Sequence, residues 1–545
     1  MGVRTWSVGC VLSAMAATGC GGDDNGGGGS GGYAQLGGTG GLAGAGGGGG
    51  QGGIAGMAGQ GGMSGSSGSG GIAGSGGGTG GAPNSPPATI TPGAADRFLL
   101  QGVVLAPSGP MTGEVLVEGN LITCVASSCS SEAGAAGATV IQSNGVILPG
   151  LIDAHNHGLF NLFDEDDWNP TKLFQNHTQW NSTSEPRYGA VVDAKQYLES
   201  VSAGANVSCE MAKWAETKAI VAGTTSFLLA PGATERKCYA ASARTIDTSY
   251  NGLPDDKIRT SISVPSSSAA TSACNAINAG TTNSYVVHIA EGIDATSRKE
   301  FDSLMAAASG CFNSKETTIV HGTSLLAAQF TQMAAAGMKL VWSPKSNVFL
   351  YNQTTDIPGA MAAGVTTIAL APDWALGGGI NMLEELRFAE DWDNKNFGDA
   401  LSTARLFQMV TIDAAKALGV EQYLGSLEVG KRADITIIGG TLADPYGDLL
   451  RTAPESVRLV MVDGRVAYGD KALQAAGPSA PGCEALDVCG VDKFLCLAES
   501  STADKLNQTL AEVRTVLETE LTKYDTTQSP VGGPLSPLAP LFKCN

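Results

Sequence analysis

Short apolar runs separated by polar residues and glycine occupy two separate parts of the chain. Between residues 97 and 150 they recur every few positions, and similar runs return at 435–438 and 459–462, where Asp463-Gly464 follows the second run. Runs of this length bounded by turn residues are typical of short β-strands, and Asp-Gly favours a two-residue hairpin. The pattern predicts two β-rich blocks that flank one central segment.

The central segment, about 270 residues long, alternates apolar strand patterns with helical patterns. This alternation indicates parallel βα units, and eight such units in this length are typical of an α/β fold of the (β/α)8 TIM-like barrel type. A doubly wound parallel sheet has the same local pattern and stays an alternative. The strand candidates lie at 146–152, 224–229, 243–246, 259–264, 285–289, 318–320, 339–342 and 366–370.

The chain beyond Asp470 has a different pattern. Five apolar side chains at helical spacing predict one amphipathic helix, capped by Ser501 or Thr502, with Leu506, Leu510, Val513, Leu517 and Leu521 on one face. Four cysteines surround this helix. We expect a disulfide-rich helical extension that packs on the body of the molecule.

The N-terminal region has the composition of an export signal followed by a linker. Arg4 precedes an apolar run from Trp6 to Ala17 that is too short to span a bilayer, an order typical of secretory signals. Ala17-Thr18-Gly19-Cys20 resembles the bacterial lipobox, whose cysteine becomes lipidated, and ordinary cleavage after Ala16 is the alternative. Of 76 glycines, 34 lie between Gly21 and Gly81, a stretch with too little apolar surface to fold.

These patterns predict an exported protein of the cell envelope, held by a lipid anchor at the membrane or secreted if that anchor is absent. The expected regions are a lipoprotein-type signal at 1–20, a Gly-rich linker at 21–96, a first sandwich segment at 97–149, a barrel at 150–423, a second sandwich segment at 424–470 and a cysteine-containing extension at 471–545. The oligomeric state does not follow from the sequence.

The charge of the chain excludes one class of partner. Its 32 basic and 51 acidic residues give a net charge of −19. An acidic surface of this size repels phosphate backbones, so we expect a small-molecule substrate and no nucleic acid.

The cysteines support export independently. Ten cysteines follow Cys20, and an even number in an exported chain indicates disulfides. Spacing favours Cys124 with Cys129, Cys209 with Cys238 and Cys274 with Cys311, and two further bridges among Cys483, Cys489, Cys496 and Cys544. Zinc-binding cysteines are the alternative, but no paired CxxC spacing occurs. Free buried thiols would suit a cytosolic chain.

Histidine is rare in this chain, yet two of the five histidines form the pair His155-Asn156-His157 at the end of a predicted strand. Residues two apart in a strand point the same way, so both imidazoles can bind one metal ion. Two histidines packed in the core are the alternative reading. His288 and His321 end two further predicted strands, and Asp373 follows another. In a barrel the carboxyl ends of the strands form the mouth of the active site.

Several motifs in order make the chain similar to the metal-dependent amidohydrolase superfamily between about residues 97 and 470. They are Pro-Gly-Leu-Ile-Asp-Ala-His-Asn-His at 149–157, His-Ile-Ala-Glu at 288–291, His-Gly at 321–322, Ser-Pro-Lys-Ser-Asn at 343–347, Asp373, and the run 424–435. The second and fourth motifs resemble the branch of guanine and cytosine deaminases and triazine hydrolases. The resemblance implies a metal-binding barrel and a small β-sandwich built from the flanking segments.

The resemblance also implies roles for particular residues. His155, His157, His288 and Asp373 are the expected ligands of one divalent ion, zinc or iron with zinc preferred, since no lysine lies within 259–264 to bridge two ions. The ion lowers the pKa of a coordinated water, which Asp373 and His321 orient and deprotonate. His321 is a ligand or a base. Glu291 is expected to protonate the leaving nitrogen, and Trp180, Asn347 and Trp374 to contact the substrate.

The expected activity is hydrolysis of a non-peptide carbon–nitrogen bond, above all deamination of a heterocyclic or amidine-like carbon. Hydrolysis of a cyclic amide, or release of a halide, is the alternative within enzymes, and a non-catalytic surface binding protein is the alternative outside them. The family's usual Gly-Thr-Asp is Ala371-Pro372-Asp373 here, followed by Trp374. The aromatic segment after His157 is either a substrate lid or the core of a long ordered loop.

Overall fold

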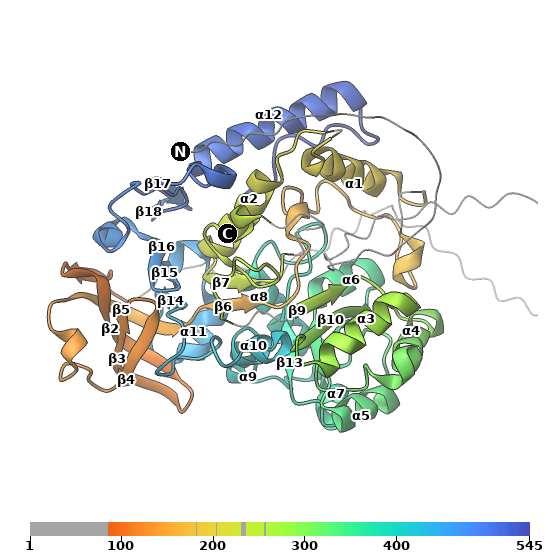
Figure 1. The fold of residues 1–545 in the computed structure, drawn as a ribbon, viewed down its shortest axis with the longest axis horizontal. Helices are drawn as coiled ribbons and strands as arrows, with labels where there is room; N and C mark the ends of the chain where they lie inside the picture. Colours follow the sequence, from red (N-terminus) through yellow and green to blue (C-terminus); the bar gives the residue numbers. More distant parts are fainter. Residues whose placement is uncertain (1–84, 181–182, 203, 230–235, 255–257, 545) are drawn as a thin grey trace, which may run out of the picture.

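A computed structural model describes residues 85–180, 183–202, 204–229, 236–254 and 258–544 (Figure 1). The predicted signal and most of the predicted linker lie outside these residues. The described chain contains three sheets, of ten, five and three strands, and none of its helices combines the length and apolar character needed to span a membrane.

The ten-stranded sheet joins the two β-rich blocks predicted at either side of the central segment. Its order is β17-β18-β16-β15-β14-β5-β2-β3-β4, with β1 paired to β5. In Figure 1 the orange strand β5 lies beside the blue strand β14, and Ile147 is in register with Ile437. The strands are β1 (Thr89–Thr91), β2 (Ala94–Ala106), β3 (Gly109–Glu118), β4 (Leu121–Ala126), β5 (Ala138–Pro149), β14 (Ile435–Ile438), β15 (Val457–Val462), β16 (Arg465–Asp470), β17 (Glu484–Val488) and β18 (Val491–Leu495).

The remaining eight strands of the described chain are all parallel to their neighbours. One sheet has the order β13-β12-β11-β10-β9 and the other β6-β7-β8. A single parallel bridge between Asn156 and Asp373 connects the chain just after β6 to the chain just after β13. The bounds are β6 (Leu151–Asp153), β7 (Thr224–Phe227), β8 (Arg244–Thr245), β9 (Ile258–Ser261), β10 (Ser284–Ile289), β11 (Thr317–His321), β12 (Lys339–Trp342) and β13 (Ile368–Leu370).

Helices separate most of these strands, as the alternating pattern predicts. Polar side chains cap several of them: Asp294 accepts from the amides of Thr296 and Ser297 at the start of α4, and Asn381 caps α8 in the same way. The helices are α1 (Pro186–Glu199), α2 (Ser208–Val221), α3 (Ser267–Asn278), α4 (Ala295–Ala306), α5 (Ala327–Ala336), α6 (Pro344–Tyr351), α7 (Ile357–Ala362), α8 (Met382–Trp392), α9 (Thr403–Met409), α10 (Ile412–Leu418), α11 (Pro445–Arg451) and α12 (Leu510–Gln528).

The C-terminal segment begins with a hairpin that the sequence analysis did not predict. Cys489 and Gly490 connect β17 to β18 with positive φ angles of 53° and 83°, the combination that a two-residue type I′ turn requires. β18 pairs with β16, so the segment extends the ten-stranded sheet.

Helix α12 follows this hairpin and packs on α1 and α2 (Figure 1). The five apolar side chains predicted for one face are all buried. The predicted cap at Ser501 or Thr502 is wrong, because Asp504 and Lys505 have positive φ angles that interrupt a helix, and Thr509 caps α12 instead.

The described residues form five disulfides, which confirm the three pairs favoured by spacing: Cys124–Cys129, Cys209–Cys238 and Cys274–Cys311. The last four cysteines form Cys483–Cys496, at the base of the hairpin, and Cys489–Cys544, which ties the end of the chain to the hairpin turn.

Candidate metal centre

The predicted histidines lie at the carboxyl ends of parallel strands. His155 and His157 follow β6, His288 is the second-last residue of β10, and His321 ends β11. Asp373 comes three residues after β13. Because the strands within each sheet are parallel, their carboxyl ends share an edge, and the side chains meet there.

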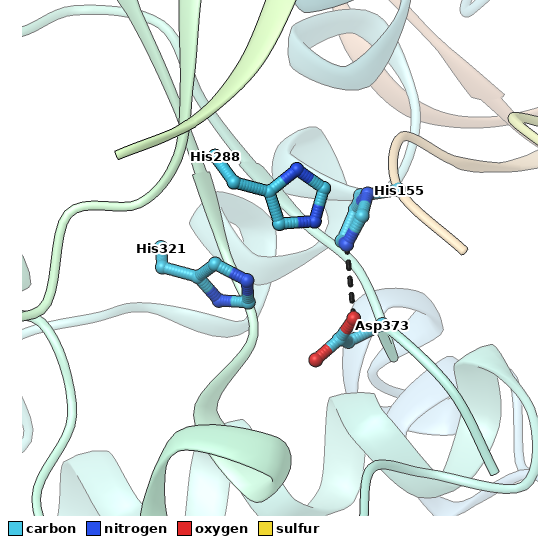
Figure 2. Close-up of side chains that lie close together, drawn as sticks. All are labelled: His155, His288, His321 and Asp373. Carbon is cyan, nitrogen blue, oxygen red and sulfur yellow. Dashed lines mark hydrogen bonds and ion pairs between the residues drawn. The ribbon is translucent and has the colours of Figure 1, made fainter. Parts of the chain in front are cut away.

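Four of these side chains form one compact cluster (Figure 2). One ligand atom from each of His155, His288, His321 and Asp373 lies within 4.8 Å of those of the other three. The shortest contact joins His155 Nε2 to Asp373 Oδ1 at 2.9 Å. All four come from different strand ends, so the fold rather than local sequence brings them together.

His157 lies against the same cluster. Its Nε2 atom is 3.4 Å from Asp373 Oδ1 and 3.3 Å from His288 Nε2. Its side chain is 27% exposed, whereas those of His155 and Asp373 are 4% exposed. The residues predicted as ligands are therefore all at one place, and His157 lies on the side that reaches solvent.

The charge state of the cluster suits a divalent cation. Burial lowers the pKa of His155, His157 and His288 to about 3, so these imidazoles are neutral at pH 7 and keep a lone pair for a metal. Burial raises the pKa of Asp373. Neutral imidazole nitrogens around a buried carboxylate are the donors that zinc and similar ions prefer. The residues present therefore fit a divalent metal ion.

Neighbouring groups fix the orientation of Asp373. Ser346 Oγ donates to Asp373 Oδ2 at 2.5 Å. In the bridge between the two sheets, the backbone amide of Asp373 donates to the carbonyl of His155, and the amide of His157 donates to the carbonyl of Asp373. Asp373 and His321 have φ angles of 73° and 68°, a strained conformation for residues other than glycine. Strain of this kind persists only where the surrounding structure holds it, and it is common at functional sites.

A chain of hydrogen bonds determines which nitrogen of His321 carries the proton. The indole N–H of Trp342 donates to Thr354 Oγ1 at 2.7 Å, and Thr354 donates to Asn347 Oδ1 at 3.2 Å. Asn347 Nδ2 then donates to His321 Nδ1 at 3.1 Å. Because Nδ1 accepts a hydrogen bond, the proton of the neutral imidazole lies on Nε2, and this nitrogen lacks a lone pair for a metal.

Glu291 lies beside the cluster, as expected from the position of its motif. Its Oε2 atom is 3.8 Å from His321 Nε2, and its Oε1 atom accepts a hydrogen bond from Tyr351 at 2.9 Å. Burial raises the pKa of Glu291 to about 7, against the opposing effect of His177. This carboxyl group therefore keeps a proton in a substantial fraction of molecules at neutral pH.

The segment between His157 and α1, called the aromatic loop below, packs into the main hydrophobic core of the molecule. Phe163, Trp168, Phe174 and Tyr188 are buried, and Trp168 lies in ring contact with Trp374 and Trp180. Of the three residues expected to contact substrate, Trp374 lies 6.1 Å from the ring of His157, Trp180 donates from Nε1 to Tyr351, and Asn347 holds His321. The aromatic loop is therefore ordered against the body of the molecule.

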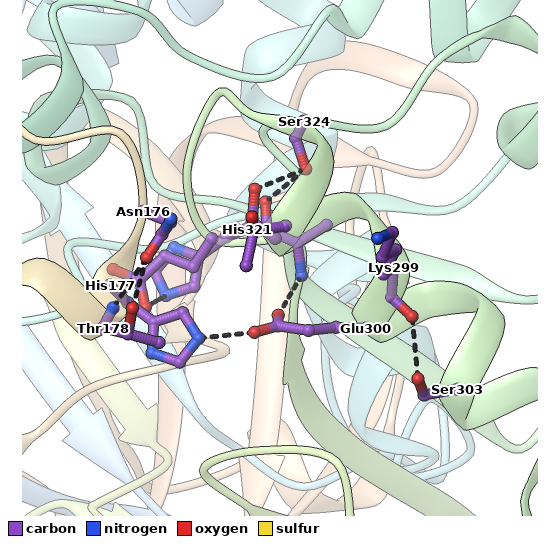
Figure 3. A network of polar contacts seen from close by, with 12 residues as sticks. Asn176, His177, Thr178, Lys299, Glu300, Ser303, His321 and Ser324 are labelled. Carbon is purple, nitrogen blue, oxygen red and sulfur yellow. Dashed lines mark hydrogen bonds and ion pairs between the residues drawn. The ribbon is translucent and has the colours of Figure 1, made fainter. Parts of the chain in front are cut away.

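Polar contacts hold this loop against the end of β10 (Figure 3). His177 Nε2 lies 2.5 Å from Glu300 Oε1, and Glu300 Oε2 accepts from the amide of Ala290 at 2.8 Å. Burial lowers the pKa of His177, but the hydrogen bond to Glu300 and the charges of nearby carboxylates together raise it overall. The His177 amide also donates to the carbonyl of Glu291. One carboxylate thus connects the loop to the segment that carries Glu291.

The sequence analysis missed Ser346, Tyr351 and Glu300. Ser346 lies within the motif Ser-Pro-Lys-Ser-Asn at 343–347, so its hydroxyl group next to Asn347 could have indicated a role at the site. Tyr351 and Glu300 bond to residues 60 and 123 positions away, respectively, and no local pattern marks such partners.

Comparisons with known proteins agree with this site. The family described as "Amidohydrolase family" matches residues 146–467, more than half of the chain and all five cluster residues. A 5-methylthioadenosine/S-adenosylhomocysteine deaminase of Desulforamulus reducens is 24% identical over 422 residues, which cover 70% of this chain and 95% of that protein. Another alignment is shorter: the chain spans only 28% of the length of the corresponding deaminase of Desulforudis audaxviator, at 32% identity.

A solved structure supports the fold. Atrazine chlorohydrolase TrzN from Arthrobacter aurescens TC1, complexed with zinc, superimposes with a TM-score of 0.54 and 17% identity, covering 70% of this chain and 96% of that one. At this identity the likeness concerns the fold alone, an α/β architecture with several sheets. The match of the family model over residues 146–467 shows that the chain belongs to the amidohydrolase family.

Proposed function

We propose that this protein is a metal-dependent hydrolase of non-peptide carbon–nitrogen bonds that deaminates a heterocyclic or amidine-like substrate. The observation that carries the proposal is a buried carboxyl group, Glu291, beside a cluster of neutral imidazoles and a carboxylate that fits a divalent cation. The deaminases among the relatives of this chain support the same reaction class.

The proposed metal ligands are His155, His157, His288 and Asp373. Their neutral ring nitrogens and carboxylate support this set, whereas the proton on His321 Nε2 favours a hydrogen-bonding role for His321. When bound, the ion supplies Lewis acidity that activates water for attack on an sp2 carbon. One ion is proposed, because the described residues form a single cluster of this kind, and zinc is preferred over iron on the donor set and on the zinc complex of the solved relative.

The side chains around the ligands divide the proton transfers. Asp373 Oδ2, which Ser346 orients, is the proposed acceptor of the proton from the attacking water. His321 Nε2–H is a donor toward the oxygen that becomes bonded to carbon. Glu291 delivers a proton to the leaving nitrogen, which departs as a neutral amine or ammonia.

The protonated carboxyl group favours nitrogen over halide as the leaving atom. An amine leaves a tetrahedral carbon readily only when it is protonated, whereas chloride leaves without a proton. A buried acid whose pKa is raised to about 7 therefore suits deamination. Trp374 and Trp180 are the proposed aromatic contacts of a flat substrate, and Asn347 acts near it through His321.

Architecture and location complete the proposal. The single bridge between the chain after β6 and the chain after β13 supports closure of the eight parallel strands into a barrel. The ten-stranded sheet would form the sandwich, and the segment from 471 onward, which adds β17 and β18 to that sheet, would be a stapled extension of it. The proposed domain boundaries are those predicted from the sequence, except that β1 and the first residues of β2 lie within the predicted linker and belong to the sandwich. Five disulfides support export to an oxidising compartment, where a lipid anchor at Cys20 would hold the protein at the cell envelope.

A screen for ammonia release tests the function. Full-length protein loaded with zinc is assayed on a panel of aminated heterocycles that includes 5′-methylthioadenosine, S-adenosylhomocysteine, cytosine, guanine and aminotriazines, with cyclic amides and chlorotriazines as the alternatives. We expect ammonia from at least one aminated substrate, loss of this activity on chelation, and a decrease of about 10²–10⁴-fold in Glu291→Gln. Turnover of cyclic amides or chlorotriazines alone would contradict the proposal.

A further inference from the structure

Two hydrogen bonds in series connect the aromatic loop to Glu291. The indole N–H of Trp180 donates to the hydroxyl oxygen of Tyr351 at 2.9 Å, and that hydroxyl donates to Glu291 Oε1 at 2.9 Å. An indole nitrogen can only donate, so the direction of the first bond is fixed. The Tyr351 proton is then directed to Glu291 Oε1, its one acceptor among the residues that the structure describes.

This direction constrains the carboxyl group of Glu291. Oε1 accepts a hydrogen bond, so when the group is protonated its proton lies on the other oxygen, Oε2. Oε2 is the oxygen that faces the cluster, 3.8 Å from His321 Nε2. Tyr351 is 1% exposed and Glu291 6%, so bulk water competes poorly for either bond.

We propose that Tyr351 and Trp180 are positioning residues that keep the transferable proton of Glu291 on Oε2, facing the metal centre. This inference rests on the proposed function. As the carbon–nitrogen bond breaks, the electron pair stays with nitrogen, the nitrogen takes the proton from Oε2, and Glu291 becomes a carboxylate. The Tyr351 hydroxyl then stabilises the charge that develops on Oε1. Burial and the nearby Glu291 carboxyl raise the pKa of Tyr351 well above its ordinary value, so the hydroxyl stays a donor.

The same chain couples the loop to the proton position. Trp180 follows the segment 176–179, which is held to the end of β10 by the bridge between Asn176 and Gly292 and by His177 and Glu300 (Figure 3). The bond from Trp180 therefore forms only while the loop is docked. Tyr351 itself belongs to α6 and stays in place, so loss of Trp180 weakens the chain without removing it.

Infrared difference spectroscopy tests the inference without any substrate. The C=O band of protonated Glu291 is identified in zinc-loaded full-length protein at pH 6 as the band that disappears in Glu291→Gln. The inference predicts that Tyr351→Phe shifts this band to higher frequency, because Oε1 loses its hydrogen bond, and that Trp180→Phe shifts it less. Tyr239→Phe is the matched control, since Tyr239 is a buried tyrosine that donates to Ser208 away from the centre.

An unchanged frequency of the Glu291 C=O band in Tyr351→Phe would overturn this inference but not the proposed function. Absence of the band from the wild type would overturn both the inference and the role of Glu291 as an acid. Both variants retain the aromatic ring, and the metal content of each is measured to establish that the centre is intact.

Kinetics give an independent readout on the amine found in the screen. Tyr351→Phe should lower kcat by about 10–100-fold while KM changes by less than about threefold, and the change should add nothing further in a Glu291→Gln background. With a chlorinated analogue of the same ring, whose leaving group needs no proton, Tyr351→Phe should lower kcat by less than about threefold. Equal losses on both substrates, or full additivity with Glu291→Gln, would show that Tyr351 is merely structural.

Discussion

At the scale of single residues, the direction of hydrogen bonds determines what the centre can do. Two tryptophans, Trp342 and Trp180, begin chains that end on His321 and Glu291, and an indole N–H cannot reverse its role. In the first chain, Asn347 donates to His321 Nδ1, so the proton of the imidazole lies on Nε2. The chemistry of the site thus depends on groups that themselves lie outside the metal cluster.

This dependence gives a prediction for Asn347. In Asn347→Asp the amide donor becomes an acceptor, so the His321 proton should move to Nδ1 and the position of the imidazole lone pair should reverse. ¹⁵N NMR of the histidine ring reports the tautomer directly, and turnover should fall by about 10²-fold with the metal retained. Asn144→Asp is the control, because Asn144 is a half-buried residue of β5 whose Nδ2 donates to the carbonyl of Pro87 in the large sheet. An unchanged tautomer in Asn347→Asp would contradict the assigned chain.

A second residue-scale prediction concerns a buried amine behind the centre. Lys218 of α2 is 1% exposed, and its Nζ atom has no hydrogen-bond partner within the part of the chain that the structure describes. It lines a small cavity with Thr224, Asp153 and Asn381. Burial lowers its pKa to about 7. Between pH 7 and 10.5 the unfolded state therefore binds more protons than the folded state, and stability increases with pH over this range.

Lys218→Met should consequently stabilise the protein, by about 1–4 kcal/mol at pH 6–7, and the gain should diminish toward pH 10. Denaturant unfolding at several pH values measures it. Lys213→Met on the same helix is the matched control, because Lys213 Nζ donates to the carbonyl of Lys505 and its loss leaves that acceptor unsatisfied. Destabilisation of Lys218→Met at every pH would contradict this account of the amine.

At the scale of elements, one short helix organises the centre. Helix α6 presents Ser346 to Asp373, Asn347 to His321 and Tyr351 to Glu291. It is held from behind, where Glu385 of α8 accepts from the amide of Lys345. The strand that precedes α6 and the helix itself therefore position three residues for which we propose a role in proton transfer.

Much of the arrangement of strands and helices could be predicted from the sequence alone. Seven of the eight parallel strands overlap their predicted positions closely, because short apolar runs between helical patterns are visible in the local sequence. The predicted strand 146–152 is instead divided between β5 of the large sheet and β6. The cluster of histidines around Asp373 was predictable because a pair such as His155-Asn156-His157 is unusual in a chain with five histidines. The β17–β18 hairpin was missed because its strands are short and partly charged, and α6 could not be assigned its role because its partners lie on other strands.

The C-terminal strap, residues 529–544, makes an element-scale prediction. It contacts α1, where Arg187 donates to the carbonyl of Gly533. It also contacts the aromatic loop, where the amide of Ala539 donates to the carbonyl of Leu162 and Lys543 forms an ion pair with Glu165. Cys489–Cys544 closes a separation of 55 residues, against 5 for Cys124–Cys129. In the chain-entropy relation these bridges contribute about 4 and about 2 kcal/mol, respectively.

The double variant Cys489→Ser with Cys544→Ser should therefore lose about twice as much unfolding free energy as Cys124→Ser with Cys129→Ser. It should also expose the aromatic loop to limited proteolysis, which the control pair should not. Equal stability losses and equal cleavage rates in the two double variants would contradict a role of the strap in holding the loop.

At the scale of the whole molecule, the metal centre joins parts of the chain that are far apart. Its side chains come from β6, β10, β11 and the end of β13, and the bridge between Asn156 and Asp373 links the three-stranded and five-stranded parallel sheets. An ion bound by these residues contacts both sheets at once. Binding to the folded state alone increases its stability, by about 4 kcal/mol at a ligand concentration a thousand times Kd.

The measurement that tests the central claim most directly is the metal content of purified full-length protein by inductively coupled plasma mass spectrometry. We expect about one divalent ion per chain in the wild type, less than about one tenth in the double variant His155→Ala with His157→Ala, and an unchanged value in His177→Ala, whose histidine pairs with Glu300 outside the cluster. Full occupancy in the double variant, or failure of the wild type to bind zinc after reconstitution, would contradict the account.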